Sequence, residues 1–197
     1  MSFDLNDYQT DFDFLSELNK YLKYFIRNDL QHADTDMLKT GIYSTLHDGR
    51  SVRIVIPHHC KYSDITLDDD LFCMGFIGYA KPFDQISETV RNEVWDIDST
   101  LMSKFSDFPD ILAYISAERI KGGDWSNLVL IKNAETIISW RDSCAHLLAR
   151  KLSVHYYSEI RIHRGRVQRG QIHVDRTVLL DYTSIPVNRT EIKWSER

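Results

Sequence analysis

Apolar residues recur in the first part of the chain at intervals of three and four, the spacing of one face of an α-helix. The pattern predicts a helix at residues 12–27, with an apolar face of Phe12, Leu15, Leu18, Tyr21, Leu22, Phe25 and Ile26. The stretch "GIYSTLHDGRSVRIVIPHHC" follows, and its Asp48-Gly49 pair suits the tight turn of a β-hairpin. Residues 1–65 are therefore predicted to form a helix and a hairpin packed on the main fold.

The hydrophobic pattern changes period several times between residues 71 and 164. The run "LFCMGFIGYAKPF", residues 71–83, carries no charge before Lys81 and is typical of a strand buried on both faces. Gly75 and Gly78 leave room in it for a group packed close to the backbone. After it, the pattern predicts a helix at residues 84–104 and two strands at 110–120 and 125–133. A second helix at 134–152 and a fourth strand at 155–165 follow.

This order of elements predicts an α+β fold with a ferredoxin-like βαββαβ sheet. Residues 71–182, which include a last strand at "RTVLLDY", form the expected core, and a polar tail follows. No linker separates two units, so residues 1–197 are expected to form a single domain. In such a sheet both core helices cover one face and leave the other bare.

The fourth predicted strand separates apolar from polar side chains, because successive side chains of a strand point to opposite faces. Tyr156, Ile160 and Ile162 point one way, while Tyr157, Glu159, Arg161 and His163 point the other. The apolar set is expected under the helices and the polar set on the bare face. That polar face is either a solvated surface of cross-strand ion pairs or the wall of an enclosed hollow in which each charge needs a partner.

Composition excludes several classes of protein. The chain is 43% apolar and 27% charged, as in ordinary globular proteins, and its net charge of −5 disfavours a nucleic-acid partner. Neither a signal peptide nor a run of about 20 apolar residues is present, so we expect a cytoplasmic protein without a membrane span. The cysteines Cys60, Cys73 and Cys144 are too far apart in the sequence for a disulfide framework or a metal-type pair.

The segment "DWSNLVLIKNAETIISWRDSCAHLLA" followed by "YYSEIRIHRG" resembles the dimeric α+β barrel superfamily. That group includes small monooxygenases, haem-degrading enzymes and many proteins without an assigned role. The resemblance covers roughly residues 71–182. It implies a ferredoxin-like protomer, a homodimer that pairs through the sheet face, and a pocket inside the barrel or between sheet and helices. Whether residues 1–65 cover that pairing face is left open.

Three residues of the polar strand face are the candidate catalytic groups. His163 is placed to act as a general base, with Glu159 orienting its imidazole. Arg161 is suited to hold a carboxylate or enolate through a bidentate contact, and Tyr157 to donate to the same oxygen. The alternative interpretation places His163 in a salt-bridged network without a catalytic role.

His146 is the candidate cofactor ligand. The haem-degrading members of the superfamily bind iron through a histidine on the second helix near a tryptophan, and Trp140 and His146 are similar in placement. A continuous helix at about 100° per residue, however, puts Trp140, Cys144 and Leu147 on one buried stripe and His146 nearly opposite, which favours a surface histidine. Cys144 on that stripe, and Cys73 within its strand, are predicted to be inert packing residues.

The sequence predicts no metal centre. His58 and His59 are adjacent, so their side chains point apart on an extended chain, and a site there would need Asp64 or His47 as well. The acidic triplet 68–70 lacks the spacing of a calcium loop. Nucleophile and phosphate-binding motifs are missing from the sequence.

Two functions from different classes follow. The first is a small-molecule-binding dimeric α+β barrel protein without demonstrable catalysis. The second is a small cytoplasmic monooxygenase or haem-related enzyme that acts on an aromatic, polyketide-like or tetrapyrrole compound. Haem is the one cofactor that the resemblance suggests, and the sequence requires none.

Overall fold

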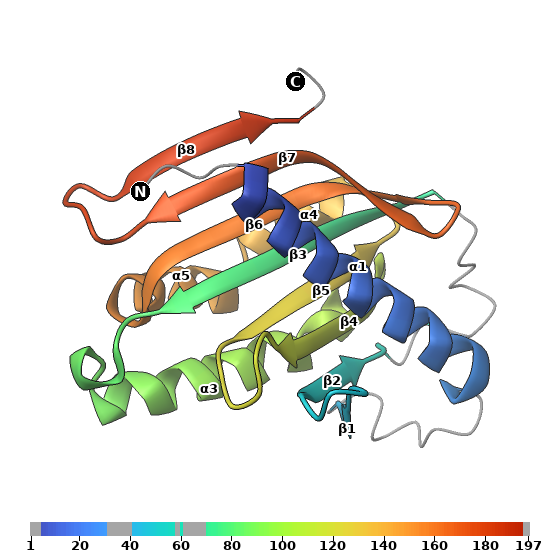
Figure 1. Ribbon diagram of the computed structural model, residues 1–197, viewed down its shortest axis with the longest axis horizontal. Helices are drawn as coiled ribbons and strands as arrows, with labels where there is room; N and C mark the ends of the chain where they lie inside the picture. Colours follow the sequence, from blue (N-terminus) through green and yellow to red (C-terminus); the bar gives the residue numbers. More distant parts are fainter. Residues whose placement is uncertain (1–4, 31–40, 58–59, 61–69, 195–197) are drawn as a thin grey trace.

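Eight strands form one antiparallel sheet in the computed structural model, which describes residues 5–30, 41–57, 60 and 70–194. Their order across the sheet is β1-β2-β4-β5-β3-β6-β7-β8 (Figure 1). The strand bounds are β1 Ile42–Thr45, β2 Ser51–Val55, β3 Leu71–Ala80, β4 Ile111–Glu118, β5 Trp125–Ile131, β6 Tyr157–Gln168, β7 Gln171–Asp181 and β8 Asn188–Lys193.

Helices cover both faces of this sheet. Helix α1 (Leu5–Asn28) crosses one face diagonally, and α4 (Glu135–Arg141) and α5 (Cys144–Tyr156) lie behind the sheet in the same view (Figure 1). Helix α3 (Glu88–Ser103) packs beside α5, and two 3-10 turns, Phe83–Gln85 and Phe105–Asp107, flank it. The face that the sequence predicted to be bare is therefore covered by α1. Among the described residues, no helix is both long enough and apolar enough to span a membrane.

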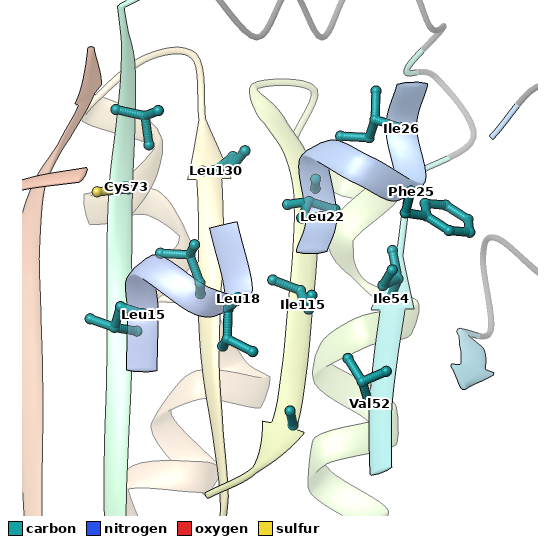
Figure 2. Close-up of a cluster of buried hydrophobic side chains, with 14 of the residues drawn as sticks. Leu15, Leu18, Leu22, Phe25, Ile26, Val52, Ile54, Cys73, Ile115 and Leu130 are labelled. Atoms are coloured by element: carbon teal, nitrogen blue, oxygen red, sulfur yellow. The ribbon is translucent and has the colours of Figure 1, made fainter. Parts of the chain in front are cut away.

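The apolar side of α1 forms the larger core with the sheet. Figure 2 shows Leu15, Leu18 and Leu22 directed from the helix towards side chains of four strands, including Cys73, Leu130, Ile115 and Ile54. Leu18 and Leu22 have no exposed surface. Full burial of a leucine side chain stabilises the fold by about 2 kcal/mol, so this interface accounts for much of the attachment of α1.

Two glycines of β3 permit close packing, as the sequence suggested. A Cβ on Gly75 would lie 2.4 Å from Cδ1 of Leu15 on α1. A Cβ on Gly78 would lie 2.5 Å from Cε1 of Tyr157. Both distances are far below a van der Waals contact, so glycine at Gly75 lets α1 approach the sheet and glycine at Gly78 accommodates the tyrosine ring.

The predicted elements of the chain occur in the predicted order, with three differences. Helix α1 begins at Leu5, a strand is present within the predicted polar tail as β8, and the helix predicted at residues 134–152 is two helices, α4 and α5. The hairpin β1–β2 turns at Gly49, whose φ of +82° suits glycine. It extends the sheet by pairing β2 with β4.

Candidate functional site

A cavity of about 510 Å³ lies between the sheet and helices α3, α4 and α5, on the side opposite α1. The walls come from both layers. Strands β3 to β8 provide one wall, with residues such as Phe76, Val129 and Ile162, and α3 and α5 provide the other, with residues such as Ile97 and Ala149. This volume is within the range of ligand-binding pockets, about 300–1,000 Å³.

Most of the cavity wall is apolar or aromatic. The wall includes the phenylalanine, tyrosine and tryptophan side chains of Phe76, Phe105, Tyr114, Trp140, Tyr157 and Tyr182. Burial raises the pKa of Tyr114 to about 12, and it also raises the pKa of Tyr157. Both phenols therefore stay protonated at neutral pH, and the Tyr114 hydroxyl accepts a hydrogen bond from Nη2 of Arg53 at 3.3 Å.

A smaller cavity of about 270 Å³ adjoins the first. Phe76, Asp98, Tyr114 and Tyr157 line both spaces, so the two are parts of one hollow under α3. The Asp98 carboxylate lies 2.8 Å from Nη2 of Arg53 and neutralises that guanidinium. Glu118 and Asp124 line the same space, so this end of the hollow is polar and has more carboxylates than cations on its walls.

His146 lies on the wall of the large cavity, which corrects the prediction of a surface histidine. The predicted single helix is interrupted at Ser143, whose side chain accepts a hydrogen bond from the His146 backbone N–H and caps α5. The helical angle of α4 therefore does not continue into α5. His146 and Trp140 consequently meet, with their ring centroids 6.0 Å apart.

The imidazole of His146 is neutral at pH 7. Burial lowers its pKa, and the positive charges of Arg150 and Arg141 lower it further, against a smaller opposite effect of Asp142. Its Nδ1 atom is buried and has no hydrogen-bond partner among the described residues. The cavity wall thus contains a polar atom that the protein does not satisfy.

Arg164 is a second polar residue of the cavity wall with an unsatisfied atom. It sits on β6 between Met74 of β3 and Arg176 of β7, and its buried Nε has no hydrogen-bond partner among the described residues. Burial lowers the pKa of Arg164, and so do the nearby cations of Arg176, Arg141 and Arg189. Sequence reasoning did not single out this residue.

Tyr157 lies on the cavity side of the sheet, so the expectation that it shares a hollow with Arg161 and His163 is wrong. The cause is a β-bulge between β3 and β6. Tyr79 is opposite Glu159 and Ala80 is opposite Tyr157, which leaves Ser158 as an extra residue. The alternation of side chains shifts by one there, and Tyr157 turns to the other face, where its ring packs edge-on against Phe76.

Arg161 and His163 meet on the α1 side of the sheet, in a buried ion network. Nη1 of Arg161 donates to Oδ2 of Asp11 at 3.2 Å, and Nε2 of His163 lies 3.0 Å from the same oxygen. Glu159 accepts from Nε of Arg161 at 2.6 Å rather than orienting His163. Burial opposes the charge of Arg161, but Asp11, Tyr79 and Glu159 outweigh this effect and raise its pKa.

The other imidazole nitrogen of His163 also has a buried partner. Nδ1 lies 2.8 Å from Oγ1 of Thr177, and Nε1 of Trp194 donates to that oxygen at 2.7 Å. Trp194 in turn packs on Tyr8 of α1, with ring centroids 3.9 Å apart. The network therefore links α1, β6, β7 and the segment after β8. His163 is 2% exposed and lines neither cavity, which is the arrangement of the salt-bridged alternative.

The described residues contain one group of three possible metal ligands outside these sites: Glu17, His47 and Asp48. Both carboxylates already bind Arg50, each at 2.6 Å, so one of their two negative charges is balanced without an ion. The residues of the "PHHC" hypothesis, His58, His59 and Asp64, lie outside the described residues, as do 68 and 69 of the acidic triplet.

The described cysteines differ in exposure. Cys73 is buried, as predicted, and burial raises the pKa of its thiol to about 12. Cys144 is exposed, which corrects the prediction of a buried packing residue. The helix is interrupted at Ser143, so Cys144 is the first residue of α5 and is exposed, whereas His146 lies on the cavity wall.

Comparison of the chain with protein-family models, curated proteins and solved structures finds no match. The assignment of a function therefore depends on the geometry of the cavity and of the ion network.

Proposed function

We propose that the protein binds an apolar or aromatic small molecule in the cavity between the sheet and helices α3–α5. The observation that carries this proposal is the cavity itself: about 510 Å³ of space with mainly apolar walls and a few convergent polar groups. Such a combination is the usual form of a ligand pocket, in which apolar contact gives affinity and polar groups fix orientation. A filled core would leave no such space.

We also propose that the core is ferredoxin-like. The elements β3, α3, β4, β5, α5 and β6 follow one another in the chain, and their strands lie in the order β4-β5-β3-β6 with antiparallel neighbours, which supports the proposal. Homodimerisation stays a prediction. Because α1 occupies the face through which the barrel superfamily pairs, a dimer of this chain would use another surface.

The binding proposal is tested with N-phenyl-1-naphthylamine, a neutral aromatic probe whose fluorescence rises in an apolar site. Ile162→Trp adds bulk to a residue of the cavity wall, whereas Ile138→Trp makes the same change at an exposed residue of α4. We expect Ile162→Trp to weaken probe binding by roughly tenfold or more and Ile138→Trp to leave it unchanged, since an occupied cavity cannot accept the ring.

A second variant of the cavity wall controls for the possibility that Ile162→Trp does not fold. Ala149→Phe fills the same cavity from α5, and its circular dichroism spectrum and melting temperature establish whether the variant is folded. Loss of probe binding in either folded wall variant supports the proposal. No probe binding by the unaltered protein, or unchanged binding in both wall variants, would refute it.

A haem-related function is the second candidate, because His146 and Trp140 line the cavity together. The ligand shell fits incompletely. A metal-binding histidine usually donates its other ring N–H to an oxygen acceptor, and Nδ1 of His146 has none among the described residues. We expect titration with hemin to give no Soret shift that depends on His146, and a shift abolished by His146→Ala would favour haem instead.

Catalysis by a monooxygenase mechanism is not required by this proposal. Arg161 and His163 lie on the α1 side of the sheet, so a ligand in the cavity would not touch them. Of the three candidate catalytic residues, Tyr157 alone lines the proposed binding site.

A further inference from the structure

Positive charge is concentrated on the cavity walls. Four arginines line the cavity, Arg141, Arg150, Arg164 and Arg189, against two aspartates, Asp98 and Asp142. Both aspartates are already paired: Asp98 with Arg53 at 2.8 Å and Asp142 with Arg141 at 2.8 Å. Arg189 is paired as well, with Glu191 at 3.8 Å, whereas Arg150 and Arg164 add positive charge to the lining. The cavity therefore has an unbalanced positive charge, in a protein whose net charge is −5.

These cations surround one part of the hollow. Arg141 and Arg189 both act electrostatically on Arg164, and Arg141 and Arg150 both act on His146. The apolar residues of α3, including Val94, Ile97 and Leu101, line the wall elsewhere. The space is therefore amphipathic, with a cationic region under α4 and α5 and an apolar region under α3.

Arg164 is the residue in this region best placed to hold an anion. Its Nε is buried without a hydrogen-bond acceptor among the described residues, and the one carboxylate that attracts it, Glu191, is paired with Arg176 at 2.9 Å. Arg164 also lines the cavity, and burial disfavours its positive charge, so an anion in the cavity would offset the cost of that burial. A guanidinium also presents a planar fork of N–H groups that matches the two oxygens of a carboxylate.

We propose that the cavity binds an amphiphilic carboxylic acid, with its carboxylate on Arg164 and its apolar body against the residues of α3. This inference rests on the proposed binding function and adds the class of ligand. The neutral imidazole of His146 lies in the same cavity, where it provides a polar contact without repelling or attracting the charge. Arg150 adds long-range attraction for the anion, whereas Arg141 and Arg189 are paired with Asp142 and Glu191.

The test is displacement of bound N-phenyl-1-naphthylamine by three compounds with the same chain: decanoate, decanol and decyltrimethylammonium. We expect decanoate to displace the probe at a concentration roughly tenfold or more below that of decanol, the size of a hydrogen bond to a charged group. Decyltrimethylammonium should be the weakest. In Arg164→Met the advantage of decanoate over decanol should disappear.

A matched variant controls for the loss of one positive charge. Arg166 lies two residues along the same strand, stacks on Phe72 and does not line the cavity. Arg166→Met should therefore keep the preference for decanoate. If Arg164→Met does not fold, Arg164→Lys replaces it, and this variant should lose part of the preference because lysine lacks the guanidinium fork.

The outcomes separate this inference from the binding function. If the probe binds but decanol competes as well as decanoate, or if the folded Arg164 variants keep the full preference, the carboxylate inference is wrong and the binding function stands. If neither the probe nor decanoate binds, both are wrong. A preference for decyltrimethylammonium also overturns the inference.

Discussion

The buried carboxylate of Asp11 provides the sharpest test of how α1 is held on the sheet. Its side chain has no exposed surface, and one oxygen, Oδ2, contacts both Arg161 and His163. In Asp11→Asn the shape of the residue is retained, but the negative charge is lost. The new amide has one oxygen in place of two, so its NH₂ group faces either Arg161 and His163 or Tyr79 and Arg119. The folded state therefore loses two charge-assisted contacts without a change in side-chain volume.

The magnitude follows from the partners that stay in place. Hydrogen bonds to charged groups contribute about 1.5–3 kcal/mol each, so two of them give an upper range of about 3–6 kcal/mol. Arg161 keeps Glu159 at 2.6 Å and Asp7 at 3.2 Å, which limits the cost of its burial. We therefore expect the free energy of unfolding to fall by about 3 kcal/mol, or Tm by roughly 6–12 °C in a protein of this size.

The assay is urea unfolding followed by tryptophan fluorescence, with Tm measured in parallel. Asp13→Asn is the matched control, because Asp13 lies on the exposed side of the same helix. From the part of the chain that the structure describes, it accepts only a side-chain hydrogen bond from Gln9. Its effect should be within about 0.5 kcal/mol of zero. If Asp11→Asn also changes the free energy of unfolding by less than about 1 kcal/mol, the network does not hold α1 and the reasoning is refuted.

Three further predictions concern the sheet and α5. Gly165→Ala should destabilise the fold by about 3 kcal/mol or more in urea, because the new Cβ would lie 1.9 Å from the His173 carbonyl oxygen; a loss below about 1 kcal/mol would contradict it. Ser143→Ala should lower the free energy of unfolding by about 1 kcal/mol through loss of the α5 cap, an effect that an unchanged Tm would exclude. Because burial lowers the pKa of His146 in the folded state, the unfolded state binds more protons below about pH 6.5. The unaltered protein should thus lose more stability than His146→Gln between pH 7 and pH 5, and parallel pH profiles would disprove this.

Much of the order of helices and strands along the chain could be predicted, because each element has its own spacing of apolar residues. The charge-free run of β3 and the alternation of β6 fixed the strands, and Asp48-Gly49 fixed the hairpin. The sequence also contains a sign of how α1 is held on the sheet. Asp11 lies four residues before Leu15, on the same helical stripe, and an acidic residue on a buried stripe requires a cationic partner. Arg161 is that partner, and His163 contacts the same carboxylate oxygen.

The errors came from local features that reverse the direction of a side chain. Ser143 caps a new helix within a stretch of unbroken helical pattern, and only the serine itself signals the interruption, as its Oγ accepts from the N–H three residues later. The bulge at Ser158 depends on pairing with Tyr79 of a distant strand, so the periodicity of β6 alone contains no sign of it. His146 and Tyr157 therefore line the cavity. The sequence had predicted His146 on the surface and Tyr157 on the bare face of the sheet.

The most direct test of the central claim is an NMR measurement of intermolecular NOEs between ¹³C-labelled decanoate and the methyl-labelled protein. If the cavity binds an amphiphilic acid, the chain methyl group should show NOEs to Ile97, Leu101 and Val129, and the Arg164 Nε–H resonance should shift on binding. NOEs confined to exposed residues such as Leu147 and Leu148 on the outer side of α5, or no NOEs at saturating decanoate, would contradict the account.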